Sequence, residues 1–173
     1  MAVSGASPRR FVSAIREPFL IGFATSSSAA ALPQVLAGLR DFGVSPRVLG
    51  FVTPLSLTLQ MNGAVAYLAV AVLFAAQASN TTMALSTQIL LFLTLKLTSK
   101  GATGIPRATV VLLAAALDQF GLPAAAVTVL LGVDALVDPI RTAANVTSHC
   151  AAPVLVGRWI GERYPTTETA SDR

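Results

Sequence analysis

The chain contains a long stretch without any charged residue. From Val48 to Leu95 it has no aspartate, glutamate, lysine or arginine. About 20 apolar residues are enough for a helix to cross the roughly 30 Å hydrocarbon core of a bilayer, so this stretch can hold at least one complete crossing. The sequence therefore predicts an integral membrane protein, which we expect to pass several times through the cell membrane.

Composition supports the same conclusion. Hydrophobic residues make up 54% of the 173 residues, and charged residues make up only 12%. Soluble domains carry about 25% charged residues, because a chain of this size has a large surface to expose to water. The composition therefore argues against a soluble protein. We expect the lipid bilayer as a partner and no nucleic acid.

Two of the four apolar segments have halves that are too short to span a membrane. Residues 8–40 are interrupted by a serine-rich stretch, Thr25 to Pro33, and residues 83–118 by the polar stretch Lys96 to Arg107. At 1.5 Å per residue each half falls well short of the hydrocarbon thickness. We expect two re-entrant hairpins. A single kinked helix, with its serines bonded to its own carbonyl groups, is the alternative for the first segment.

The other two segments are long enough to cross. Residues 48–78 contain the polar interruption Thr58 to Gly63, which predicts a broken transmembrane helix, and residues 123–163 predict a polar transmembrane helix. Residues 164–173 are expected to form a disordered tail. The expected fold is an all-α integral membrane protein, in which two re-entrant helical hairpins and two transmembrane helices form an inverted repeat.

Loop charge supplies an orientation. Arg9, Arg10 and Arg16 lie at the start of the first hairpin, whereas the later stretches "QASNTT" and "DQFGLP" carry no positive charge. The positive-inside rule places the arginines in the cytoplasm, so the first hairpin would enter from inside and the second from outside. Inverted repeats with broken helices are typical of secondary transporters.

A polar stripe runs along the last apolar segment. Asp134, Asp138, Arg141, Asn145 and His149 follow one another at spacings of 4, 3, 4 and 4 residues, which keeps them on one face of a helix. Each charge facing lipid at the bilayer centre would cost about 2.5–3.5 kcal/mol. The stripe must therefore face protein, water or a ligand. An ion pair that only neutralises the helix is the structural alternative.

The stripe also carries a family resemblance. "DALVDPIRTAANVT" resembles the last-helix motif of the dicarboxylate/amino acid:cation symporters, the glutamate transporter family. "REPFLIGFATSSSAAALP", "PLSLTLQMNGAVAYLAVAVLFAAQ" and "TSKGATGIPRATVVLLAAALDQFGLP" resemble its first hairpin, its broken helix and its second, gating hairpin. The resemblance covers about residues 10–164 and implies that residues 1–173 are the core of the moving transport domain. It also implies a separate scaffold domain and a homotrimer as partners.

The resemblance assigns roles to individual residues. Asp138 would hold the amino group of a small anionic substrate and Arg141 its side-chain carboxylate, for which the planar guanidinium fork is suited. The expected substrate-binding residues are Ser27, Ser28, Asp138, Arg141, Thr142, Asn145, Gly104, Ile105 and Pro106. The expected cation-binding residues are Ser56, Thr58, Gln60, Asn62, Asn145 and His149.

Two positions depart from the family pattern. The family's N-M-D-G-T reads Gln60 to Ala64 here, with Asn62 in place of the aspartate, and His149 replaces the carboxylate at the end of the last-helix motif. Losing two anionic ligands favours H+ over Na+ as the coupling ion, because a histidine titrates near pH 6.5, within about a unit of physiological pH. A neutral, hydrogen-bonded His149 is the alternative. Beyond possible sodium, no metal or cofactor is expected.

The leading hypothesis is the core of a secondary active transporter that moves an acidic amino acid or C4-dicarboxylate together with a cation. The alternative is a truncated or non-transporting membrane homologue that keeps the fold without coupled transport. An intramembrane enzyme would need Ser27, His149 and Asp134 to act as a triad, and nothing in the sequence supplies an oxyanion site. We therefore expect no enzymatic activity.

Overall fold

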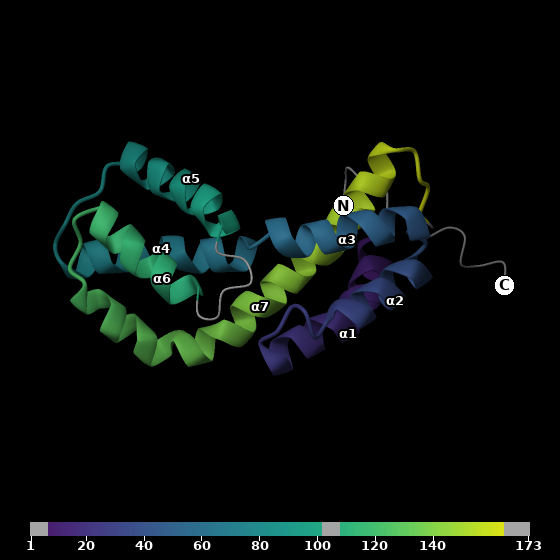
Figure 1. The fold of residues 1–173 in the computed structure, drawn as a ribbon, viewed down its shortest axis with the longest axis horizontal. Coiled ribbons are helices and arrows are strands. Elements are labelled where there is room, and N and C mark those ends of the chain that lie inside the picture. The colour runs from purple at the N-terminus through teal and green to yellow at the C-terminus, as the bar shows by residue number, and fades with distance from the viewer. Residues whose placement is uncertain (1–6, 102–107, 165–173) are drawn as a thin grey trace. The chain divides into compact units, whose positions relative to one another are not determined.

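The computed structural model describes residues 7–101 and 108–164, and all of their regular secondary structure is helical (Figure 1). This confirms the all-helical part of the predicted fold. The expected gate residues Gly104, Ile105 and Pro106 lie outside the described residues, as does the expected tail beyond Tyr164. The helices are α1 (Pro8–Thr25), α2 (Leu32–Phe42), α3 (Pro46–Leu59), α4 (Asn62–Ala78), α5 (Leu85–Gly101), α6 (Ala108–Gln119) and α7 (Ala125–Trp159).

The chain divides into two compact units, which are described separately. The first unit contains Met1–Gln60 and Thr142–Arg173, and the second unit contains Met61–Arg141. Each unit has its own apolar core. The boundary lies at the junction of α3 and α4 and again within α7, so α3 belongs to the first unit, α4 belongs to the second, and α7 contributes residues to both.

In the first unit α1 packs against α2, and α2 packs against α3. The serine-rich stretch between α1 and α2 forms a turn in which side chains bond the backbone. Thr25 Oγ1 donates to the carbonyl oxygen of Ile21 at 2.7 Å, and the backbone N–H of Ala30 donates to Ser27 Oγ at 3.2 Å. These local bonds between side chains and backbone stabilise the turn between the two helices. Insertion of this helix pair into a bilayer as a re-entrant hairpin stays a prediction.

Aromatic side chains form one end of the first core. The rings of Phe11 and Phe42 meet edge to face with centroids 6.0 Å apart, and the ring of Tyr164 lies 5.5 Å from that of Phe42. The Tyr164 hydroxyl donates to Glu162 Oε2 at 2.9 Å. Burial, together with this bond and the Glu162 charge, raises the pKa of Tyr164. The segment after α7 is thereby anchored to the α1–α2 pair.

The junction of α3 and α4 interrupts the apolar stretch. Gln60 has φ −110° and ψ 106°, an extended conformation, and α4 begins two residues later at Asn62. The interruption thus falls within the predicted stretch Thr58 to Gly63. Within the described residues, Pro46–Ala78 is the one helical stretch whose length, 33 residues, and apolar composition would allow it to cross a membrane.

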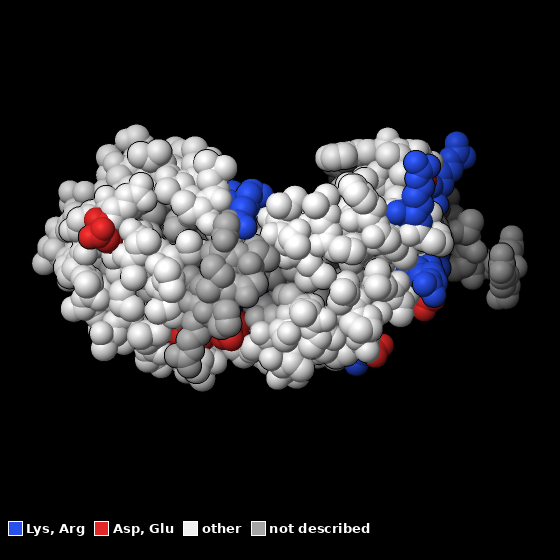
Figure 2. Space-filling view, viewed as in Figure 1, with Lys and Arg blue, Asp and Glu red and all other residues white. Residues whose placement is uncertain are grey.

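In the second unit α4 packs against both α5 and α6, and α5 packs against α6. Leu68, Val72, Leu91 and Leu117 are almost fully buried at the centre of this core. Many large apolar side chains nevertheless remain exposed, and Figure 2 shows few charged atoms on the visible face of this unit. Large exposed apolar surfaces indicate contact with lipid or with another protein surface.

Gly38 allows α1 and α2 to approach closely. A Cβ atom at Gly38 would lie only 2.3 Å from the carbonyl oxygen of Ala14, a backbone atom that cannot rotate away. Any larger residue at this position must push the two helices apart. The close approach therefore sets the geometry of the α1–α2 pair.

We predict that Gly38→Ala lowers the free energy of unfolding by about 1–3 kcal/mol, the usual cost of overpacking. The measurement is thermal unfolding of the purified chain in detergent, followed by circular dichroism. Gly50→Ala is the matched control, because a Cβ atom at Gly50 meets nothing within 4 Å. The control should be neutral or slightly stabilising, since alanine favours helix over glycine. Equal stability of the two variants would contradict the proposed packing constraint.

Candidate functional site

A buried arginine on α7 pairs with two carboxylates. Arg141 is only 9% exposed. Its Nη1 donates to Asp134 Oδ1 at 2.9 Å, and its Nη2 donates to Asp138 Oδ1. The carboxylates lie three and seven residues before the arginine, so the helical repeat brings all three side chains to one face. The structure thus brings together the three charges of the predicted stripe.

An aromatic ring from α4 completes this cluster. The guanidinium carbon Cζ of Arg141 lies 4.9 Å from the centre of the Tyr67 ring, within the range of a cation–π interaction. The Tyr67 hydroxyl also hydrogen-bonds the Asp134 side chain. Tyr67 therefore contacts both the guanidinium and the Asp134 carboxylate. Its ring covers one face of the guanidinium and leaves the other face open to a ligand.

The two carboxylates differ in access. The side chain of Asp134 is 25% exposed and that of Asp138 is 37% exposed, against 8% for Arg141. A guanidinium has five N–H donors, and these ion pairs occupy one on each terminal nitrogen. A ligand can therefore reach the pair from the Asp138 side, while Asp134 and Tyr67 continue to hold the arginine.

The other expected substrate residues that the structure describes lie in the first unit. Ser27 and Ser28 are partly exposed in the turn between α1 and α2, and Thr142 and Asn145 lie on α7. A Cβ atom at Gly22 of α1 would lie 2.7 Å from Val146 Cγ2, so α1 approaches this part of α7 closely. The meeting of these residues with Asp138 and Arg141 in one pocket stays a prediction.

The expected cation residues lie around the helix interruption and on α7. Ser56, Thr58, Gln60, Asn145 and His149 belong to the first unit, and Asn62 belongs to the second. His149 is only 3% exposed, and its side chain contacts the backbone of Ser56.

Several buried polar atoms in this part of the first unit have no hydrogen-bond partner among the described residues. They include His149 Nδ1, Gln60 Oε1 and Thr53 Oγ1. A buried polar atom without a partner costs about 1–3 kcal/mol, so each of these atoms has capacity to bind a water molecule, a proton or an ion. A cation shared among them stays a prediction.

Sequence reasoning missed two residues of the second unit. Tyr67 is the only aromatic residue of α4 with a polar end, a signal that points to a hydrogen bond when such a ring is buried. Lys96 on α5 is the first charged residue after the long uncharged stretch, and its Nζ donates to Asn62 Oδ1. A charged residue within an apolar helix is itself a functional signal.

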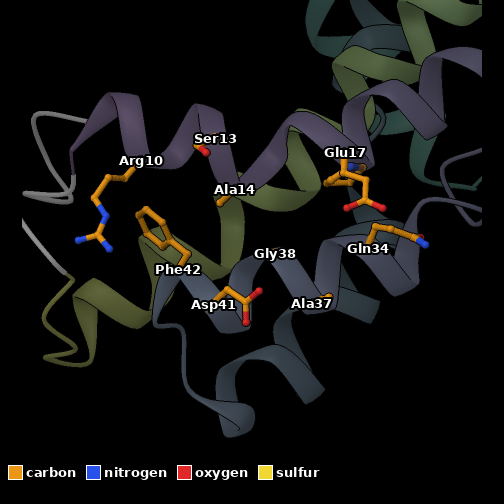
Figure 3. A pocket seen from close by; sticks show the side chains of 10 residues that line it. Arg10, Ser13, Ala14, Glu17, Gln34, Ala37, Gly38, Asp41 and Phe42 are labelled. Carbon is orange, nitrogen blue, oxygen red and sulfur yellow. The ribbon is translucent and has the colours of Figure 1, made fainter. Parts of the chain in front are cut away.

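A separate groove lies between α1 and α2 (Figure 3). It has a volume of about 370 Å³, and Arg10, Glu17, Gln34 and Asp41 are among the residues that line it. No expected substrate or cation residue lines this groove. Within residues 7–101 and 108–164, no three His, Cys, Asp or Glu side chains are grouped to hold a metal ion.

A helical chain with a membrane-length apolar stretch and a buried, reachable charge cluster has the features of a membrane transport protein. The sequence profile of the Sodium:dicarboxylate symporter family matches residues 1–159, and the chain belongs to this family. The resemblance found in the sequence is confirmed, and the family is one of transporters and not of enzymes.

Relatives in this family differ in the substrate and ion that their names state. The chain is 40% identical over 141 residues to the Proton/glutamate-aspartate symporter of Bacillus subtilis, covering 82% of this chain and 34% of the relative. It is 39% identical over 159 residues to the C4-dicarboxylate transport protein of Pseudomonas savastanoi pv. phaseolicola, covering 91% and 35%. It is 33% identical over 163 residues to the Proton/sodium-glutamate symport protein of Bacillus subtilis, covering 94% and 38%. The chain thus spans about a third of the length of these relatives.

We predict that Tyr67→Leu lowers the free energy of unfolding by about 0.5–2 kcal/mol more than the control Phe74→Leu, which removes a ring from the exposed side of the same helix. Tyr67→Phe should fall between the wild type and Tyr67→Leu, because it keeps the ring over Arg141 and loses only the bond to Asp134. Thermal unfolding in detergent measures all three. A Tyr67→Leu chain as stable as the Phe74→Leu chain would show that the ring does not support the arginine.

Proposed function

We propose that this chain is the moving core of a multi-pass carrier in the cell membrane that transports an acidic amino acid together with a cation, with a proton favoured over sodium. The observation that supports this most is the buried Arg141, paired with two carboxylates of which one is reachable. Family membership supports the transport class. In this proposal residues 8–40 and 83–118 act as re-entrant hairpins, and a scaffold and trimer complete the carrier.

The charge cluster suggests how the substrate binds. An acidic amino acid carries an ammonium group and a side-chain carboxylate, which match Asp138 and Arg141 respectively. Binding then exchanges one ion pair within the protein for two between protein and substrate, so that neither Asp138 nor Arg141 is left without a partner. The α-carboxylate of the substrate requires further hydrogen-bond donors from the protein. This balance matters because an unpaired charge in a dry site costs far more than a paired one.

The same balance separates amino acids from dicarboxylates. A C4-dicarboxylate has no ammonium group, so its binding at Arg141 would release the Asp138 carboxylate and leave it facing a second anion. A proton on Asp138 would be needed to remove that repulsion. We therefore favour an acidic amino acid over a C4-dicarboxylate as the substrate, although relatives of both names are similar to this chain.

The coupling ion is proposed from the neutral residues at the expected cation positions. Asn62 and His149 carry no fixed negative charge, and the buried His149 Nδ1 has no hydrogen-bond partner among the described residues. One relative is named a proton symporter and another a proton/sodium symporter. The same neutral residues favour the alternative function, a homologue that binds substrate without coupled transport.

We predict that Asp138→Asn weakens aspartate binding at least about tenfold, the loss expected when a charge-assisted hydrogen bond worth about 1.5–3 kcal/mol is removed. Succinate binding should stay equal or improve, because the variant removes the repulsion between two carboxylates. Isothermal titration calorimetry on the purified chain measures both affinities. Asp118→Asn, an exposed carboxylate on α6, is the control and should change neither. Equal losses for aspartate and succinate would refute the assignment of the amino group to Asp138.

We predict that aspartate binding takes up protons in the wild type and that His149→Gln removes this uptake. The number of protons follows from the dependence of the calorimetric enthalpy on the ionisation enthalpy of the buffer. Cys150→Ala, a change at the neighbouring buried residue, is the control and should keep the uptake. The same proton number in His149→Gln and wild type would leave His149 as a neutral packing residue and refute its coupling role.

A further inference from the structure

A lysine ammonium lies against the first residue of α4. Lys96 sits near the end of α5, and its Nζ donates to the side-chain oxygen Oδ1 of Asn62. Both side chains are half-buried. Asn62 directly follows the helix interruption and is one of the expected cation-binding residues, so this contact occupies an oxygen to which the sequence assigns a coupling ion.

No carboxylate neutralises the lysine within the part of the chain that the structure describes. Among the described residues, Asp134 and Asp138 both pair with Arg141, and no carboxylate lies at ion-pair distance from Lys96. An unneutralised lysine in a membrane segment is expensive, and such residues mark functional sites. A purely structural role would be served at lower cost by an apolar side chain at this position.

The surrounding packing holds the lysine in place. Leu91 and Leu95 of α5 are almost fully buried in the same core as Val65 and Leu68 of α4. Because α5 packs directly on α4, the residue after Leu95 cannot move far from the start of α4. The ammonium is therefore tethered beside Asn62 at a high effective concentration.

We propose that Lys96 is a tethered cation that takes the place of a free coupling ion at Asn62, so that the chain binds its acidic substrate without sodium at that oxygen. The inference rests on the proposed function. Hard monovalent cations and ammonium groups carry the same charge and bind the same amide oxygens. A second cation brought within a few ångströms of the ammonium is repelled, and the low dielectric of a membrane protein strengthens this repulsion.

The test compares aspartate affinity in sodium chloride with that in choline chloride, using calorimetry on the purified full chain. The wild type should bind equally in both salts. Lys96→Met should bind aspartate at least about tenfold more tightly in sodium than in choline, because the competing charge is gone. Lys96→Met combined with Asn62→Asp should show a larger sodium effect, since it adds an anionic ligand.

Lys100→Met is the matched control. It removes the same charge from the same face of α5 one turn further on and leaves the contact between Lys96 and Asn62 in place. This control should remain indifferent to sodium. A sodium effect of equal size in Lys100→Met and Lys96→Met would assign the effect to general charge and overturn the proposal, as would a wild type that already depends on sodium.

Direct binding of radiolabelled sodium separates this inference from the proposed function. If no variant binds aspartate or succinate, the proposed function fails, but sodium binding still decides the role of Lys96. Sodium should bind to Lys96→Met and to the more conservative Lys96→Gln at least about tenfold more tightly than to the wild type. Equal sodium binding by the wild type and a folded Lys96 variant, with folding verified by thermal unfolding, would overturn the inference.

Discussion

The ion pairs of Arg141 with Asp134 and Asp138 are the interaction on which the second unit depends. Three charges are tolerable on an apolar helix only because each has a partner and because Tyr67 covers the guanidinium. In the proposed function the same arrangement binds the substrate, since the side chain of Asp138 is 37% exposed and the arginine keeps further N–H donors. Stability and recognition would then come from one cluster, and the substrate would compete directly with the ion pairs that stabilise the helix.

Lys96 and Arg141 differ in the partners of their positive charges. The arginine pairs with two carboxylates, whereas the lysine donates to the neutral oxygen of Asn62 and has no carboxylate at ion-pair distance among the described residues. With two carboxylates against one guanidinium, the Arg141 cluster carries an excess negative charge when all its groups are ionised, and Lys96 adds a positive charge to the same unit. The second unit thus contains fixed charges of both signs. In a carrier, a bound coupling ion can also supply positive charge that compensates carboxylates.

Local sequence signals predicted the local parts of the structure. The serine-rich stretch and the polar residues around Gln60 both interrupt helices, because side-chain and turn chemistry acts within a few residues. Helical spacing likewise predicted that Asp134, Asp138 and Arg141 share a face. The contacts of Tyr67 and Lys96 were not predictable, because they join side chains of α4 to residues of α7 and α5 that are distant in the sequence. Membrane insertion of the two predicted hairpins would depend on the surrounding lipid, which no pattern within the chain records.

Opposite faces of α7 carry apolar and charged residues, so the two faces require different environments. Val129, Val133, Leu136 and Ile140 are exposed and repeat at spacings of 4, 3 and 4 residues, so they form an apolar stripe. The charged stripe begins five residues after Val129, which at 100° per residue places it roughly 140° around the helix from the apolar stripe. Lipid suits the first stripe and would penalise the second. The helix is therefore suited to a boundary, with one side against apolar surroundings and the other against polar protein, water or substrate. In the proposed function, this boundary is where the carrier holds its substrate.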